Sequence, residues 1–167
     1  MEPLSPPDTH YVTAAVGWLE LGAAGEALAE LNCLPEDKRA HPDVLEVYWM
    51  IHAFQKAWDK ALAEAEALIA VAPERASGWL HRAYALRRTP QGSLKLAWDA
   101  LLPAFTRFPK EAVIPFNLAC YACQMDDLEA ARHWLQRATA VGGDKEIRAM
   151  ALADPDLEPL WAELKQT

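Results

Sequence analysis

The sequence lacks the features that would place the chain in a membrane or outside the cell. No segment approaches the roughly 20 uninterrupted apolar residues that a membrane helix needs. The N-terminal residues MEPLSPPDTHY show no basic region followed by an apolar run, so we expect no secretory signal. The 167-residue chain has three cysteines, an odd number that fits a reducing cytoplasm better than a disulfide-stapled secreted domain. We therefore expect a cytoplasmic protein that does not engage a membrane.

Positive charge is also scarce. Sixteen Lys and Arg residues face 24 Asp and Glu residues, giving a formal net charge of -8 and a pI near 5.1. Nucleic-acid binders present a net basic face to the phosphate backbone, so we expect no nucleic-acid partner. Arg87-Arg88 is the only local basic candidate. With 52% hydrophobic and 24% charged residues, the composition indicates a globular chain of about one domain.

Motifs for catalysis or cofactor binding are equally few. The three serines do not occur in a G-x-S-x-G setting, and the seven glycines form no phosphate-cradling loop. His52 and His81 could act as an acid-base pair, but a partly buried, packed imidazole is the simpler interpretation of His52. We therefore predict no catalytic residue, no bound metal and no cofactor.

An internal repeat dominates the sequence. The segments GEALAEL, DKALAEAEAL, LKLAWDALL and LEAARHWLQRA align on Ala27, Ala61, Ala97 and Ala131, with spacings of 34, 36 and 34 residues. The two extra residues fall in RTPQGS, at 88–93, a Pro/Gly turn where an insertion costs little. Such a period predicts a repeat architecture.

Each repeat is predicted to contain two helices. Apolar periodicity and proline positions place the first helices at 9–22, 42–56, 76–88 and 111–125, and the second at 24–34, 58–72, 92–107 and 127–141. Pro42 suits the first turn of its helix, and Asp126 or Asp127 can cap a following one. No segment shows sustained alternation with β-branched residues, so we predict no sheet.

These features resemble tetratricopeptide repeats, which are helix-turn-helix units with a period of 34 residues. The small residue of the family's first helix is matched by Ala15, Ala83 and Ala119, whereas Trp49 departs from the pattern. The alanine of its second helix is matched four times, and its closing proline by Pro73 and Pro109. The resemblance implies an all-α, right-handed superhelical solenoid of about four repeats with a C-terminal helical cap.

The predicted organisation follows from this alignment. It comprises a flexible tail (1–8), four repeats spanning 9–143 (9–41, 42–75, 76–111 and 112–143) and capping helices in 144–167. In the last part, Asp144 and Asp154 are expected to cap short helices at 145–152 and 155–165. Trp161 is expected to pack in this cap, although it could instead project as a docking contact.

The resemblance further implies a concave groove lined by the first helices. Carried over by alignment, the predicted groove residues are Glu46, Met50, Leu80, His81, Tyr84, Arg87, Phe116, Asn117, Cys120 and Cys123. The spacing Cys120-x-x-Cys123 could suggest redox or metal chemistry, but these thiols fall about two turns into a helix with no nearby cation and without four ligands. They are interpreted as small, soft groove residues.

We therefore predict a non-enzymatic adaptor that binds another protein, as an extended peptide or an amphipathic helix, in this apolar groove. Two alternatives remain at this stage. One is a structural subunit, or a dedicated chaperone similar to the bacterial class II chaperones of type III secretion, that binds through its convex face or its Trp161 end. The other is an enzyme in which His81, Tyr84, Cys120 and Cys123 converge around a small molecule. The sequence leaves the oligomeric state open.

Overall fold

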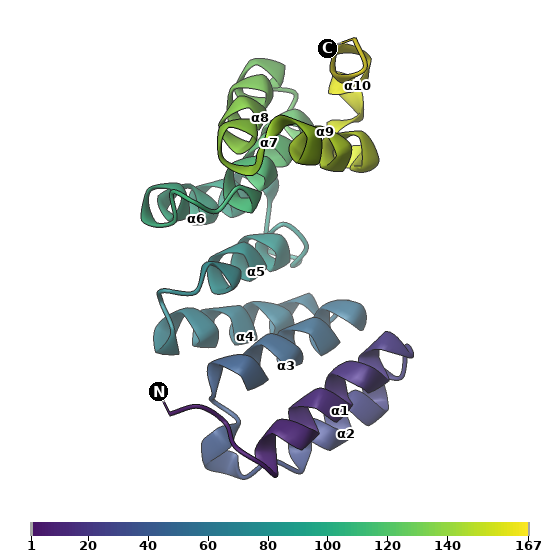
Figure 1. Ribbon diagram of the computed structural model, residues 1–167, viewed down its shortest axis with the longest axis vertical. Coiled ribbons are helices and arrows are strands. Elements are labelled where there is room, and N and C mark those ends of the chain that lie inside the picture. The colour runs from purple at the N-terminus through teal and green to yellow at the C-terminus, as the bar shows by residue number, and fades with distance from the viewer. Residues whose placement is uncertain (1, 167) are drawn as a thin grey trace. The chain divides into compact units, whose positions relative to one another are not determined.

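Helices account for the fold throughout the part of the chain that the structure describes. The computed structural model describes residues 2–166, which contain helices and turns and no strand. The α-helices are α1 (Asp8–Glu20), α2 (Ala24–Asn32), α3 (Pro42–Phe54), α4 (Trp58–Val71), α5 (Ala76–Leu86), α6 (Leu94–Arg107), α7 (Val113–Gln124), α8 (Leu128–Gly142), α9 (Asp144–Ala153) and α10 (Trp161–Leu164) (Figure 1). Two 3-10 helices, η1 (Glu36–Lys38) and η2 (Pro155–Leu160), complete the set. The predicted all-α class and its eight repeat helices are confirmed.

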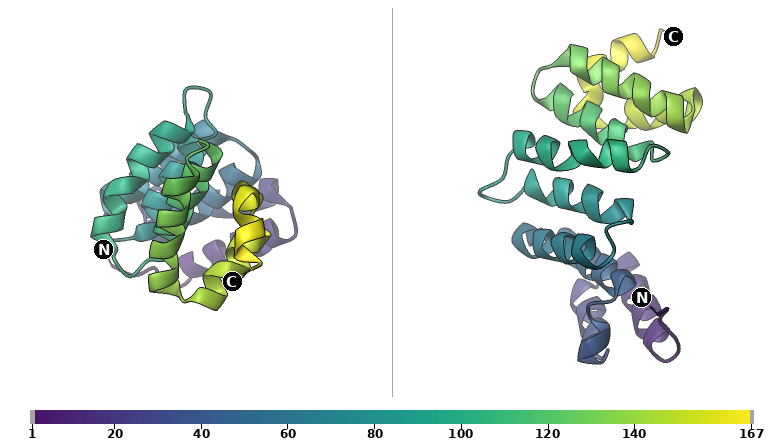
Figure 2. Two further views of the ribbon diagram at one scale, coloured as in Figure 1. Left: turned by 90° about the horizontal axis from the view of Figure 1, so that it is seen from above. Right: turned by 90° about the vertical axis from the view of Figure 1, so that its left-hand side faces the viewer.

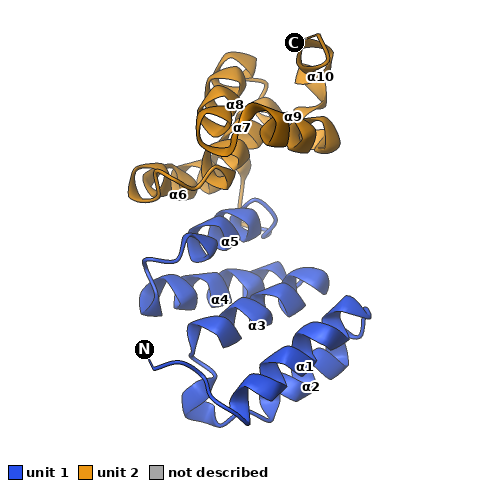
Figure 3. Cartoon of the chain, in the orientation of Figure 1, with its two compact units in different colours: residues 1–90 blue, residues 91–167 orange. Residues whose placement is uncertain are grey.

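The chain divides into two compact units, residues 1–90 and 91–167 (Figure 3). The division falls between Pro90 and Gln91, inside the turn where the third repeat carries its two extra residues. The compact units therefore do not follow the expected repeat boundaries, because the expected third repeat, 76–111, is shared between them.

In unit 1, each helix packs against its neighbours in sequence. Helix α1 lies beside α2, α3 packs on both, and α4 lies between α3 and α5 (Figures 1 and 2). Leu31, Val44 and Ile51 are fully buried where α2 and α3 meet, and they form one core cluster with Ala15 and Ala27. Burial of such side chains contributes roughly 1.5–3 kcal/mol each.

The alanine columns of the repeat occupy helix crossings. The exposed fraction is 0% for the four alanines of the second helices and the three of the first: Ala27, Ala61, Ala97, Ala131, Ala15, Ala83 and Ala119. A methyl-sized side chain lets two helix axes approach closely, whereas a larger one would have to displace the facing helix. The repeat in the sequence is thus a packing repeat.

Helix termini follow the local sequence signals in most cases. Helix α3 begins at Pro42, and the backbone N–H of Ala130 donates to the Asp127 carboxylate at 3.0 Å, which caps α8. The expectation for Asp144 was wrong. Gly143, with φ 87°, is the residue before α9, and Asp144 is its first helical residue, pairing with Arg148 at 3.2 Å instead of capping the helix.

The N-terminal segment is packed where we expected a flexible tail. Leu4 contacts the core cluster of unit 1. The His41 imidazole donates through Nε2 to the carbonyl oxygen of Glu2 at 3.2 Å and accepts through Nδ1 from the backbone N–H of Asp43. These contacts fix the segment that leads into α1.

Unit 2 is built from α6, the α7–α8 pair and the C-terminal helices. Helix α7 packs on α6 and α8, and η2 packs on α7. Leu157 and Leu160 of η2 are buried, and the Trp161 indole N–H donates to the carbonyl oxygen of Ala151 at 2.8 Å. The segment expected as one helix is divided into η2 and α10, since Pro159 within it lacks an amide donor. Trp161 is packed in the cap, as expected.

Candidate functional site

An aromatic cluster connects α3 and α5 of unit 1. The Trp49 and His81 rings are stacked, with centroids 3.7 Å apart and planes inclined by 5°. The Tyr84 ring meets Trp49 edge-on at 5.9 Å. His81 and Tyr84 are three residues apart and therefore share one face of α5. The departure at Trp49 from the small-residue pattern is thus filled by aromatic contacts with the first helix of the next repeat.

Two further residues extend this cluster. Trp58, the first residue of α4, lies 5.9 Å from Tyr84 between ring centroids. The Arg88 guanidinium lies 3.5 Å from the Tyr84 centroid and 5.3 Å from that of Trp58, so it contacts both rings. We refer to Trp49, Trp58, His81, Tyr84 and Arg88 as the aromatic cluster. Cation-π contacts of this kind stabilise a fixed position for the guanidinium.

The cluster holds a neutral imidazole. Burial lowers the pKa of His81 to about 4, although the Glu46 carboxylate acts in the opposite direction. The ring is therefore uncharged at neutral pH and acts as a flat stacking partner. Its Nδ1 atom is buried and has no hydrogen-bond partner within residues 2–166, so the ring contributes to the cluster through stacking.

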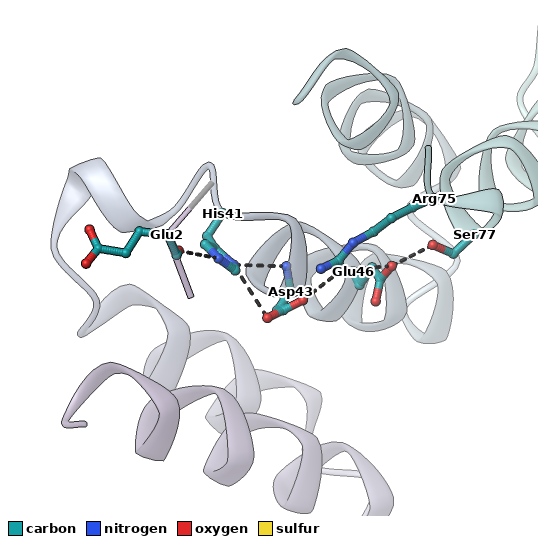
Figure 4. A network of polar contacts seen from close by, with 6 residues as sticks. All are labelled: Glu2, His41, Asp43, Glu46, Arg75 and Ser77. Carbon is teal, nitrogen blue, oxygen red and sulfur yellow. Dashed lines mark hydrogen bonds and ion pairs between the residues drawn. The ribbon is translucent and has the colours of Figure 1, made fainter. Parts of the chain in front are cut away.

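Glu46 belongs to a polar network that joins the starts of α3 and α5 (Figure 4). Its carboxylate accepts from the Ser77 hydroxyl at 2.5 Å and lies 3.5 Å from the Arg75 guanidinium. Arg75 also pairs with Asp43 at 2.7 Å. These contacts raise the pKa of Arg75, against the effect of its burial. Glu46 therefore acts as a structural link within unit 1, and its carboxylate is already engaged.

Three large apolar side chains of α3 and α5 remain exposed in unit 1. The exposed fractions are 39% for Met50, 55% for Phe54 and 37% for Tyr84. Met50 and Phe54 are four residues apart and lie on one face of α3. An apolar surface with rigid aromatic support is the kind of feature that marks an interaction site.

In unit 2, the chain's own C-terminal segment covers the predicted groove residues of α7. Phe116, Cys120 and Cys123 are only 5%, 2% and 3% exposed, and the Cys120 thiol donates to the Asp154 carboxylate at 3.7 Å. The Gln124 amide donates to the carbonyl oxygen of Asp156 at 3.2 Å, which holds η2 on the same helix. These three side chains therefore offer little surface to a partner.

The environment of the thiols suits packing. Burial and the carboxylates of Asp156 and Asp126 raise the pKa of Cys123, whereas a reactive thiol requires a lowered pKa. The structure brings no group of three His, Cys, Asp or Glu side chains together as a metal site within residues 2–166. Of the residues named for the catalytic alternative, His81 and Tyr84 belong to unit 1, and Cys120 and Cys123 belong to unit 2.

The remaining predicted residues are less prominent. Leu80 and Arg87 are partly buried, and the Asn117 amide donates to the carbonyl oxygen of Val113 at 2.9 Å, within its own helix. His52 is buried and stacks on Tyr48 at 6.3 Å, so its surroundings differ from those of His81.

Sequence reasoning missed the parts of the site contributed by the α3–α4 turn. The stretch KAWDK, residues 56–60, places an aromatic residue between two lysines at a helix start. That pattern was the available signal. It went unrecognised because the alignment followed only the inward face of the first helices, and Trp58 begins a second helix.

Comparisons with known proteins identify the fold. No protein-family profile matches the chain, and no curated protein sequence matches it. Among solved structures, a thermophilic TPR protein from Thermus thermophilus, TTC0263, aligns with a TM-score of 0.69 and 17% identity, covering 95% of each chain. A MamA RS-1 ArsTM double mutant aligns with a TM-score of 0.68 and 17% identity, covering 83% of this chain and 77% of that one.

These likenesses confirm the tetratricopeptide-repeat-like fold that the sequence predicts. The chain has the all-helical architecture of this class of solenoid. Within residues 2–166, no helix combines the length and apolar character needed to cross a bilayer.

Proposed function

We propose that this chain is a non-enzymatic interaction scaffold that binds an extended peptide or an amphipathic helix of another protein. The contact surface consists of Met50, Phe54 and Tyr84, of which Tyr84 belongs to the aromatic cluster. The observation that carries the proposal is the exposure of these three large apolar side chains in unit 1, of which Tyr84 is fixed by its contacts with Trp49 and Trp58.

Preorganisation supports this assignment. Binding to a surface that is already ordered avoids the entropy cost of immobilising its side chains. Tyr84 is held by Trp49, Trp58 and Arg88, while Met50 supplies an adaptable thioether. An apolar face of a partner peptide can therefore pack on rigid rings and adjust to a flexible neighbour.

The C-terminal alternative has less support. Trp161 donates its indole N–H within the chain and is partly buried, so the anchor suggested for docking at that end is already engaged. The proposal includes a cytoplasmic location, which the three free thiols favour.

The test is a selection of short random peptides displayed on phage against the immobilised chain. Selected peptides are synthesised with a fluorescent label, and their dissociation constants are measured by anisotropy. The Met50→Ala/Tyr84→Ala variant is expected to weaken binding about tenfold or more, the scale of a hot-spot contact. Circular dichroism is expected to show the wild-type helical content at the temperature of the binding assay, with a lower melting temperature because Tyr84 contacts Trp49, Trp58 and Arg88.

The matched control is Leu96→Ala/Met150→Ala, which truncates two exposed apolar side chains of unit 2. It is expected to leave the affinities within about twofold. If all selected peptides bind the Met50→Ala/Tyr84→Ala variant as well as the wild type, the proposed surface is wrong. Loss of binding in the control alone would place the interaction surface in unit 2.

A further inference from the structure

A pocket beside the aromatic cluster carries an unusual charge for this chain. It lies within unit 1, at the turn between α3 and α4, and has a volume of about 360 Å³. Its lining residues are Lys56, Ala57, Trp58, Asp59, Lys60, Arg88 and Pro90. The volume falls in the range of small-ligand and side-chain pockets, roughly 300–1,000 Å³.

The lining is basic although the chain is acidic. Three cations, Lys56, Lys60 and Arg88, face one carboxylate, Asp59, so the pocket is net positive in a chain with a formal charge of -8. Neither lysine forms an ion pair with any of residues 2–166. Both are exposed. The two ammonium groups are therefore available to an external anion.

Arg88 couples this pocket to the proposed apolar surface. Its Nη1 donates to the carbonyl oxygen of Tyr84 at 3.0 Å, and its guanidinium contacts the Tyr84 and Trp58 rings. Trp58 lines the pocket and also belongs to the aromatic cluster. A bound segment that packs on Tyr84 can therefore reach the cations of the pocket at the same time.

We propose that this pocket, which we call the basic pocket, binds Asp or Glu side chains of the same partner segment that packs on Met50 and Tyr84. The assignment rests on the proposed function and adds the partner's chemistry, an acidic segment with an apolar or aromatic anchor. Charge complementarity favours carboxylates on a peptide. The excess of eight negative charges on the chain repels any anion, and the repulsion grows with the ligand's charge, so a short segment with one or two carboxylates is favoured over a polyanion such as nucleic acid.

The experiment repeats the random-peptide selection on three proteins: the wild type, Lys56→Glu/Lys60→Glu and Lys110→Glu/Lys145→Glu. The last pair changes two exposed lysines of unit 2 and so matches the change in charge. Peptides selected on the wild type and on the control are expected to be enriched in Asp and Glu relative to the starting library. Peptides selected on the pocket variant are expected to lose that enrichment.

A second measurement tests individual peptides. An acidic peptide selected on the wild type is resynthesised with Gln for Glu and Asn for Asp. The amide form is expected to bind the wild type about tenfold more weakly, and the difference is expected to disappear on the pocket variant. Raised salt is expected to weaken only the acidic form.

Several results would overturn the proposal. If the selected peptides need Met50 and Tyr84 but are not enriched in Asp and Glu, the proposed function stands and the role proposed for the basic pocket is wrong. If peptides selected on the pocket variant are still enriched in Asp and Glu, the cations that bind the acidic side chains lie outside this pocket. Sedimentation that shows self-association lost only in Lys56→Glu/Lys60→Glu would identify a second copy as the occupant. Binding of a single-stranded oligonucleotide that acidic peptides do not displace would identify nucleic acid.

Conversely, if binding of acidic peptides depends on Lys56 and Lys60 but not on Met50 and Tyr84, the role of the basic pocket stands and the proposed apolar surface is wrong. The two proposals therefore fail by different observations.

Discussion

The imidazole of His81 lies flat against the indole of Trp49, with ring centroids 3.7 Å apart and an angle of 5° between the planes. The tetratricopeptide pattern expects a small residue at position 49, and the structure accommodates the larger one by pairing it with an aromatic ring from α5. The stack depends on an uncharged imidazole whose pKa is lowered to about 4 by burial.

This stack predicts a pH dependence of stability. An unfolded histidine has a pKa near 6.5 and binds a proton more readily than folded His81. The stabilisation is therefore complete above about pH 6.5 and is lost as the pH falls toward 4. Between pH 7.0 and 4.5, the free energy of unfolding of the wild type is expected to fall by about 2 kcal/mol more than that of His81→Phe. Urea unfolding followed by tryptophan fluorescence measures this difference.

The comparison with His81→Phe separates the contribution of His81 from those of two other titratable groups, whose effects on the pH dependence of stability oppose each other. Burial also lowers the pKa of His52, and it raises the pKa of Glu64. Both remain in the two proteins. The exposed His10 provides a control, because His10→Phe should keep the wild-type pH dependence. Identical pH dependence in the wild type and His81→Phe would contradict the account.

The alanine repeat predicts sensitivity to added volume. Ala131→Leu inserts a larger side chain where α8 packs with no exposed surface at this position, and is expected to cost about 1–3 kcal/mol. Ala140→Leu, at an exposed position of the same helix, is expected to change stability by less than about 0.5 kcal/mol. Denaturant unfolding of both variants provides the measurement, and equal stabilities would show that Ala131 does not lie at a close crossing.

The C-terminal segment predicts unequal thiol reactivity. Cys33 is exposed, whereas Cys120 and Cys123 are buried beneath η2. One thiol is therefore expected to react quickly with a chromogenic disulfide reagent, and two only when unit 2 opens. Leu157→Ala, which creates a cavity under η2, should accelerate the two slow reactions. Leu96→Ala, a substitution at an exposed position, should leave the rates of these two reactions unchanged. Three equal rates in the wild type would argue against coverage by this segment.

The turn before α8 predicts opposite effects at two neighbouring aspartates. Asp127 caps the helix, so Asp127→Ala is expected to cost about 1 kcal/mol. Asp126 has φ 61°, a conformation that glycine adopts without a Cβ penalty. Asp126→Gly should therefore be neutral or stabilising. Thermal melting of the two variants distinguishes these roles, and equal losses would show that the cap contributes nothing specific.

Local sequence determined the helices and their packing positions. Interactions between residues close in the chain explain the period of 34 residues, the buried alanines and the proline at the start of α3. Such patterns can be recognised from the sequence alone. The same reasoning placed the α8 cap at Asp126 or Asp127, and Asp127 is the one that caps the helix. It was wrong at Asp144 because Gly143 takes the position before α9 and leaves the aspartate inside the helix.

Tertiary structure decided which predicted groove residues present surface. Phe116, Cys120 and Cys123 have groove-facing positions in the repeat, but residues more than thirty positions later in the chain fold back onto α7 and bury them. Alignment to a repeat carries no information about such a non-repeating segment. Conversely, Lys56, Trp58 and Arg88 come together because a turn, a helix start and a helix end meet in space. Helical periodicity therefore determined the scaffold, whereas long-range packing determined its exposed chemistry.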